Sequence, residues 1–168
     1  MRRRDWILWC GLMALLSSGC GSQMSTYTRP QAPWATIQKV AVTPFSLPSE
    51  NPTRRLLITQ LFSEELRKTG IEVIEIPLAG PTGGVPTLEE IAKKYQVDAV
   101  FSGSVDDSQG TVVHVRLHDA ATSEVLWSGT YLLGVGPEFF SIRTQQQQFE
   151  KSIRRLLQNF SDQRETGS

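Results

Sequence analysis

Residues 99–133, AVFSGSVDDSQGTVVHVRLHDAATSEVLWSGTYLL, decide the fold of this chain. They contain three runs rich in β-branched and aromatic residues, which predict strands, separated by two short polar segments, which predict turns. The predicted strands are 99–104, 111–118 and 125–133. In the middle run Val113, Val115 and Leu117 alternate with His114, Arg116 and His118. This alternation predicts one buried and one solvated face, and the short turns predict an antiparallel meander.

Strands and helices alternate upstream of this meander. Short apolar runs predict strands, and apolar residues at helical spacing predict helices, one ended by Gly70 and one opened by a capping box at Thr87. The predicted elements are a strand over 39–45, a helix over 54–69, a strand over 71–77 and a helix over 88–95. A last amphipathic helix is predicted over 145–162.

The order strand, helix, strand, helix, strand, strand, strand, helix predicts an α/β (α+β mixed) domain. The first three strands, joined through helices, are expected to pair in parallel, and the last three in antiparallel order. We therefore predict one mixed five-stranded sheet with helices packed on it. The predicted single domain covers 37–163, and a disordered tail is expected over 164–168.

The amino terminus has the three parts of an export signal. Three arginines precede an apolar run that is too short to span a membrane, and small residues then lead to Cys20. The segment Leu15-Leu16-Ser17-Ser18-Gly19-Cys20 resembles a bacterial lipobox, in which the chain is cut before the cysteine and the cysteine is acylated, although Ser17 stands where Leu is usual. An ordinary secretory signal is the alternative. We predict a lipoprotein signal peptide over 1–19, lipidation at Cys20, and a flexible tether over the rest of 20–36.

Charge and composition limit the classes of partner that this chain is expected to bind. The chain has 17 basic and 17 acidic residues, and loss of 1–19 leaves 14 basic and 16 acidic. A slightly negative domain is not expected to bind nucleic acid, which favours a strongly basic face. The expected membrane contact is through acylated Cys20. By analogy with lipoproteins sorted by the residue after the cysteine, Gly21 predicts an outer-membrane location facing the periplasm, if the source is Gram-negative.

Few residues of the sequence are candidates for catalysis or for binding a metal or cofactor. His114 and His118 are separated by about 13 Å on a strand, too far for one metal ion. Ser102 and Ser104 have no base nearby in the sequence, and the glycine-rich segment 78–86 lacks the Lys-Ser or Lys-Thr of a phosphate-binding loop. We therefore expect no enzyme activity, no cofactor and no metal.

Three segments carry a family resemblance: VAVTPF at 40–45, DAVFSGSV at 98–105 and RLHDAATSEVLW at 116–127. They resemble a family of periplasmic lipoprotein domains that includes the amino-terminal domain of TolB, the periplasmic domain of CsgG, and LpoB. The resemblance implies the fold. Within these motifs Asp98, Asp119 and Thr122 suit turns and Gly103 suits a close backbone approach. Ser123 stands where the family usually has Gly, which predicts either strain in a left-handed turn position or a different turn.

The expected function is a non-catalytic protein-interaction or assembly module of the cell envelope. An LpoB-like activator of a peptidoglycan synthase, or a small-molecule or glycan-binding module using 78–86, are the alternatives. The expected partner is another envelope protein or a second copy of the chain. The predicted contact surface is a sheet edge or the last helix with Gln145, Gln146, Gln147 and Gln148. CsgG-like membrane hairpins are not expected, because the connections are short.

Overall fold

The computed structural model describes residues 24–47, 52–77, 86–106, 112–132 and 142–166. The predicted signal peptide and Cys20 therefore lie outside the described residues. The strands are β1 (Met24–Thr28), β2 (Lys39–Val42), β3 (Glu72–Glu75), β4 (Ala99–Asp106), β5 (Val112–Asp119) and β6 (Val125–Leu132). The helices are the short η1 (Trp34–Thr36), α2 (Pro52–Arg67), α3 (Leu88–Tyr95) and α4 (Ile142–Thr166).

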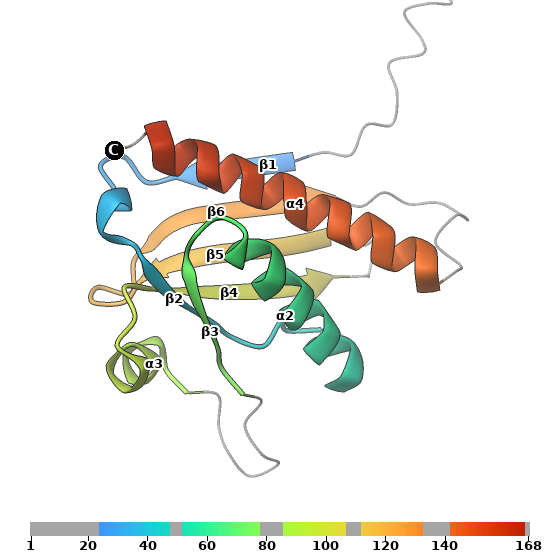
Figure 1. The fold of residues 1–168 in the computed structure, drawn as a ribbon, viewed down its shortest axis with the longest axis horizontal. Coiled ribbons are helices and arrows are strands. Elements are labelled where there is room, and N and C mark those ends of the chain that lie inside the picture. Colours follow the sequence, from blue (N-terminus) through green and yellow to red (C-terminus); the bar gives the residue numbers. More distant parts are fainter. Residues whose placement is uncertain (1–23, 48–51, 78–85, 107–111, 133–141, 167–168) are drawn as a thin grey trace, which may run out of the picture.

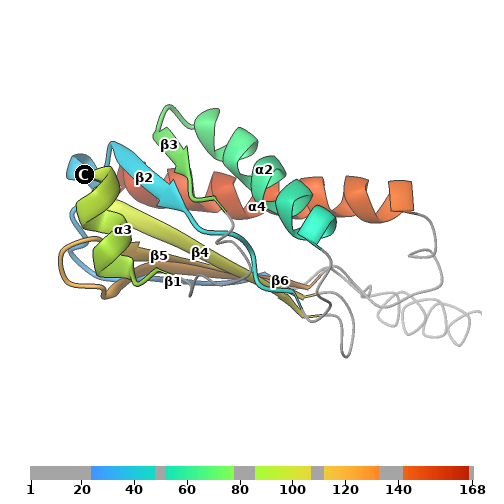
Figure 2. The same ribbon diagram turned by 90° about the horizontal axis from the view of Figure 1, so that it is seen from below.

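All six strands form one mixed sheet in the order β1-β6-β5-β4-β2-β3. β2 pairs in parallel with both β3 and β4, whereas β4, β5 and β6 form an antiparallel meander. Helices α2 and α4 cover one face of the sheet, and α3 lies on the other face (Figures 1 and 2). The predicted fold class, the parallel pairings and the meander are confirmed.

The predicted number of strands and the predicted tether are wrong. Residues 24–28 form β1, which pairs antiparallel with β6 from Met24–Tyr131 to Thr28–Trp127. The segment that follows also folds, since Trp34 is only 3% exposed and packs edge-on against Phe160. The sequence pattern missed β1 because an edge strand that exposes most of its side chains needs no alternation of apolar residues. The folded domain therefore begins at Met24 and not at residue 37.

The main core lies between the sheet and helices α2 and α4. Its centre is a chain of aromatic rings in which Phe101 contacts Phe62, Trp127 and Phe160 at centroid distances of 5.3, 6.4 and 5.5 Å. A smaller cluster under α3 joins Ile91 to Ala41 and Val100 on the opposite face. The alternating apolar residues of β5 all point into the main core, as the sequence predicts.

Several element boundaries differ from prediction by a few residues, among them those of helices α2 and α4. Helix α4 continues to Thr166, so the tail predicted to be disordered from 164 is wrong up to that residue. The extra turn is supported by Thr166, whose hydroxyl donates to the carbonyl of Asp162. Helix α2 begins at Pro52, where a proline suits a first turn.

Glu65 links α2 to α4. Its carboxylate lies 2.6 Å from Lys68 Nζ and 3.1 Å from Arg154 Nε. Burial raises the pKa of Glu65, but the hydrogen bonds from Lys68 and Arg154 outweigh this effect and hold the pKa below its ordinary value of 4.5. Glu65 is therefore charged at neutral pH and fixes α4 beside α2.

Among the helices in the described ranges, none combines the length and the apolar character needed to cross a bilayer.

Candidate functional site

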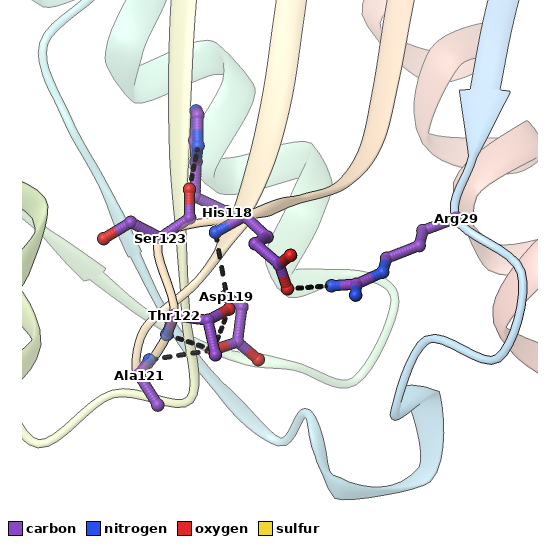
Figure 3. Close-up of polar contacts among 7 residues, drawn as sticks. Arg29, His118, Asp119, Ala121, Thr122 and Ser123 are labelled. Atoms are coloured by element: carbon purple, nitrogen blue, oxygen red, sulfur yellow. Dashed lines mark hydrogen bonds and ion pairs between the residues drawn. The ribbon is translucent and has the colours of Figure 1, made fainter.

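The turn between β5 and β6 is organised by Asp119 (Figure 3). Its Oδ1 accepts the N–H groups of Ala121 at 2.9 Å and Thr122 at 2.7 Å, and also the Thr122 hydroxyl. The backbone closes the same turn, since Ser123 N–H donates to the Asp119 carbonyl. The prediction that Asp119 and Thr122 bond their own turn is confirmed.

The motif around Asp98 meets this turn at one end of the sheet. Asp98 Oδ2 accepts the N–H groups of Gln38 and Lys39 at 2.9 and 2.8 Å, and the Asp98 carbonyl accepts from Ala120. These bonds hold the start of β2 beside the meander. Gly103 is also structural, because a Cβ there would lie 2.3 Å from the Phe45 ring. The residues of the family-like motifs therefore hold backbone in place.

Ser123 occupies the left-handed region with φ of 60°, which is the first of the two predicted alternatives. We expect Ser123→Gly to raise the free energy of unfolding by roughly 0.5–1 kcal/mol, because glycine adopts this conformation without steric cost. Urea denaturation of the domain produced without residues 1–20 measures the change. Ser128→Gly, in the extended strand β6, is the matched control and should destabilise the domain by a similar amount. A loss of stability in Ser123→Gly would contradict the prediction.

The sheet face opposite α2 and α4 carries polar side chains over β5 and β6. His118 Nε2 lies 3.1 Å from Ser102 Oγ, and His118 Nδ1 lies 3.4 Å from the Ser123 carbonyl oxygen. The expectation that Ser102 has no base nearby is therefore wrong, because pairing of β4 with β5 brings together residues 16 positions apart. The second histidine, His114, instead contacts Thr130 Oγ1 at 3.0 Å. Among the described residues His118 contacts the Ser102 hydroxyl and a backbone carbonyl, and these contacts include no carboxylate of the kind that orients the histidine of a Ser-His-Asp triad.

Within the described part of the chain, no three His, Cys, Asp or Glu residues gather in a way that could hold a metal ion. The other predicted sites are placed only in part. Gln147 and Gln148 are exposed in the first turns of α4, and the side chains of Gln145 and Gln146 lie outside the described residues, as does most of the segment 78–86. Their role as a partner interface stays a prediction.

The two edge strands of the sheet, β3 and β1, differ in how well charged side chains protect them from pairing with another strand. At β3, Glu72 forms an ion pair with Lys39 at 3.5 Å and Glu75 with Arg67 at 2.7 Å. Charged side chains along an edge strand disfavour pairing with another strand. At β1, the strand MSTYT has no charge and no proline. Met24 and Tyr27 are 42% and 52% exposed. β1 is therefore an edge open to another strand.

Two contacts fix β1 on the sheet at its carboxyl end. Arg29 donates its backbone N–H to the Leu126 carbonyl at 2.8 Å, and its guanidinium pairs with Glu124 beside the β5–β6 turn (Figure 3). Because the edge is held in place before any partner arrives, its backbone groups are preorganised for pairing.

A hollow of about 370 Å³ lies beside the start of β1. It is lined by Met24 and Tyr131 from the sheet and by Arg155, Gln158, Asn159 and Asp162 from α4. Arg155 donates to the Tyr131 hydroxyl at 2.9 Å, whereas the buried Oδ1 of Asn159 has no hydrogen-bond partner among the described residues. Helix α4 therefore leaves space next to the open edge of β1.

Comparison with known proteins gives a fold and no family. No protein-family model matches this chain, and no curated protein matches it. Among solved structures, the PelC dodecamer from Paraburkholderia phytofirmans is 20% identical, with a TM-score of 0.61 over 82% of this chain and 95% of that one. Lipoprotein GNA1162 from Neisseria meningitidis is 18% identical, with a TM-score of 0.50 over 71% and 96%. A weaker likeness is to TolB from Acinetobacter baumannii, 15% identical, with a TM-score of 0.45.

These likenesses show that the chain shares its fold with bacterial proteins that include a lipoprotein. At such low identity they show the fold alone. The predicted resemblance to lipoprotein domains is supported at this level, and the TolB, CsgG and LpoB relationships stay predictions.

Proposed function

We propose that this chain is a non-catalytic assembly module of the cell envelope. It is acylated at Cys20, anchored in the outer membrane on the periplasmic side, and associates there with further copies of itself. The function needs no reactive side chain. Its mechanism is local concentration, since proteins confined to one surface meet at an effective concentration that lets a weak interface suffice.

The observation that carries the proposal is the position of β1. The strand begins at Met24, four positions after Cys20. Four residues of fully extended chain reach about 14 Å at most. An acylated Cys20 would therefore hold the folded domain against the membrane, with the open edge of β1 close to the lipid surface. A longer tether would let the domain tumble freely, whereas this short one limits the orientations of neighbouring copies.

Two further observations support the proposal. One solved protein of this fold is described as a PelC dodecamer, and another is described as a lipoprotein. The polar residues of the family-like motifs, chiefly Asp98 and Asp119, are engaged with backbone N–H groups. These observations favour assembly over catalysis.

Crosslinking in intact membranes tests the proposal. Full-length protein treated with a lysine-reactive crosslinker should give dimers or larger multimers that contain this chain alone, as judged by mass spectrometry of each band. Lys151 is exposed on α4, which contacts β6 next to β1, so it is available to the reagent on that side of the sheet. Monomers alone at natural abundance, or crosslinks only to a different protein, would contradict self-association.

A further inference from the structure

We infer that two copies of this chain join through β1, edge to edge and antiparallel, with Thr26 of each copy on the two-fold axis. This inference rests on the proposed self-association and names the surface that carries it. A second copy of the chain is the partner that we place on the β1 edge. The hydrogen-bonding pattern of this edge, its lack of charge and the hollow beside it all suit pairing with a second β1.

The hydrogen-bonding pattern of β1 sets the register. Arg29 donates its N–H to Leu126 in β6. Backbone groups in an antiparallel ladder alternate between the two sides of a strand. Tyr27 and Ser25 therefore point their backbone groups at β6, and Thr28, Thr26 and Met24 point theirs outward.

These three outward residues can pair with the same residues of a second copy. When Thr26 faces Thr26 of the partner subunit, Met24 faces the partner's Thr28, and Thr28 faces the partner's Met24. All three pairs are then of the hydrogen-bonded kind, which gives about six new backbone bonds. A shift by one residue would place outward groups against groups already bound to β6, and a shift by two would leave only two of the three pairs, so this register gives the most backbone bonds.

Charge and space favour the same arrangement. β1 has no charged residue, so two copies of it meet without repulsion. Pairing of two β3 edges would instead bring together charged side chains, since Glu72 and Glu75 and their basic partners lie along that edge. Side chains at 24, 26 and 28 lie on the α4 side of the sheet, because Met24 pairs with the core residue Tyr131. The hollow between Met24 and α4 leaves room there for the side chain of the partner's Thr28.

The anchors are compatible with this pair. The two chains enter antiparallel strands from opposite ends, and the two-fold axis of such a pair runs perpendicular to the sheet. If this axis is parallel to the membrane normal, and the sheet face opposite α4 points toward the lipid, both acylated cysteines reach the same bilayer. On that face α3 packs against β2 and β4, at the far side of the sheet from β1.

Two five-residue strands bury less surface than a stable soluble dimer needs, which is about 1,200 Å² or more. The pair should therefore form at the membrane, where anchoring raises the local concentration, and dissociate when the anchor is lost.

Cysteine crosslinking of full-length protein in membranes tests the register. Acylation occupies the thiol of Cys20, so an introduced cysteine is the free thiol of the mature chain. Residues in a hydrogen-bonded antiparallel pair lie about 5.5 Å apart, within the range that a disulfide bridges. Under mild oxidation, Thr26→Cys should give about tenfold more disulfide dimer than Met24→Cys, because the two Met24 positions are separated by about 13 Å along the strands. Co-expression of Met24→Cys with Thr28→Cys should restore the dimer.

A second pair of variants keeps the test independent of disulfide geometry. Thr26→Arg or Thr26→Glu alone should weaken lysine crosslinking between copies, because like charges meet on the axis and neither change adds a reactive amine, and co-expression of the two should restore it. Thr26 is exposed, so these changes should leave the fold intact, and a thermal melt checks this.

The outcomes separate the two proposals. Abundant multimers in the wild type together with no dimer from Thr26→Cys would overturn the β1 pairing and leave self-association standing. A dimer from Met24→Cys alone that equals that from Thr26→Cys would overturn the antiparallel register. Absence of multimers from the wild type and of dimers from every cysteine variant would overturn both.

Discussion

Replacing Phe160 with alanine should lower the free energy of unfolding by about 3–5 kcal/mol. The Phe160 side chain is fully buried in α4. Its ring lies 5.5 Å from Phe101, 5.5 Å from Trp127 and 5.9 Å from Trp34. The substitution therefore leaves a cavity at the point where the last helix, the sheet and the segment after β1 meet. Domains of this size have a total stability of about 5–15 kcal/mol, so a large fraction would be lost.

Urea denaturation of the domain produced without residues 1–20 measures this change. Phe160→Leu keeps most of the buried volume and should cost about 1–2 kcal/mol. Gln158→Ala is the matched control, because Gln158 is exposed on the same helix and its loss should change stability by less than about 0.5 kcal/mol. A Phe160→Ala variant as stable as the Gln158→Ala control would contradict the observed packing of α4.

Replacing Cys20 with serine should move the protein from the membrane fraction to the soluble fraction. Each buried CH₂ of an acyl chain contributes about 0.8 kcal/mol, and anchoring by two or more chains is firm, so loss of the acylated residue removes nearly all membrane affinity. Fractionation followed by immunoblotting measures the distribution. Mass spectrometry of the wild-type amino terminus should find an acylated Cys20. At equal cellular abundance the soluble variant should also lose its multimers, because confinement to a surface is gone.

Cys10→Ser provides the matched control. Cys10 lies within the predicted signal peptide, so its replacement should leave membrane attachment unchanged. Retention of Cys20→Ser in the membrane, or release of Cys10→Ser, would show that the anchor lies elsewhere and would remove the basis of the proposed function.

Local patterns predicted much of the fold. The helix over 88–95 is found with its predicted bounds, because a capping box of four residues specifies its start. In this box Thr87 Oγ1 accepts from Glu90 N–H at 3.2 Å, and the Glu90 side chain accepts from Thr87 N–H at 2.8 Å. The β5 strand was predictable because a strand with one buried face must alternate. The left-handed conformation of Ser123 was one of two alternatives that the family resemblance implied, because the family usually has Gly at this position.

Long-range pairing explains what the sequence pattern missed. β1 has the composition of a polar linker, and only the free edge of β6 makes it a strand. The contact between Ser102 and His118 is likewise invisible in sequence, since it depends on the register of β4 against β5.

By itself, the sequence determined the mixed sheet, the meander, the capped helix and a candidate anchor at Cys20, because each depends on spacing within a few residues. The tertiary structure alone decided that the sheet has a sixth strand, that this strand is an edge without charged residues, and that it begins four positions after Cys20. The physical reason is that an edge strand is stabilised by hydrogen bonds to a partner more than 90 residues away, and backbone bonding of this kind places almost no demand on which side chains the strand carries.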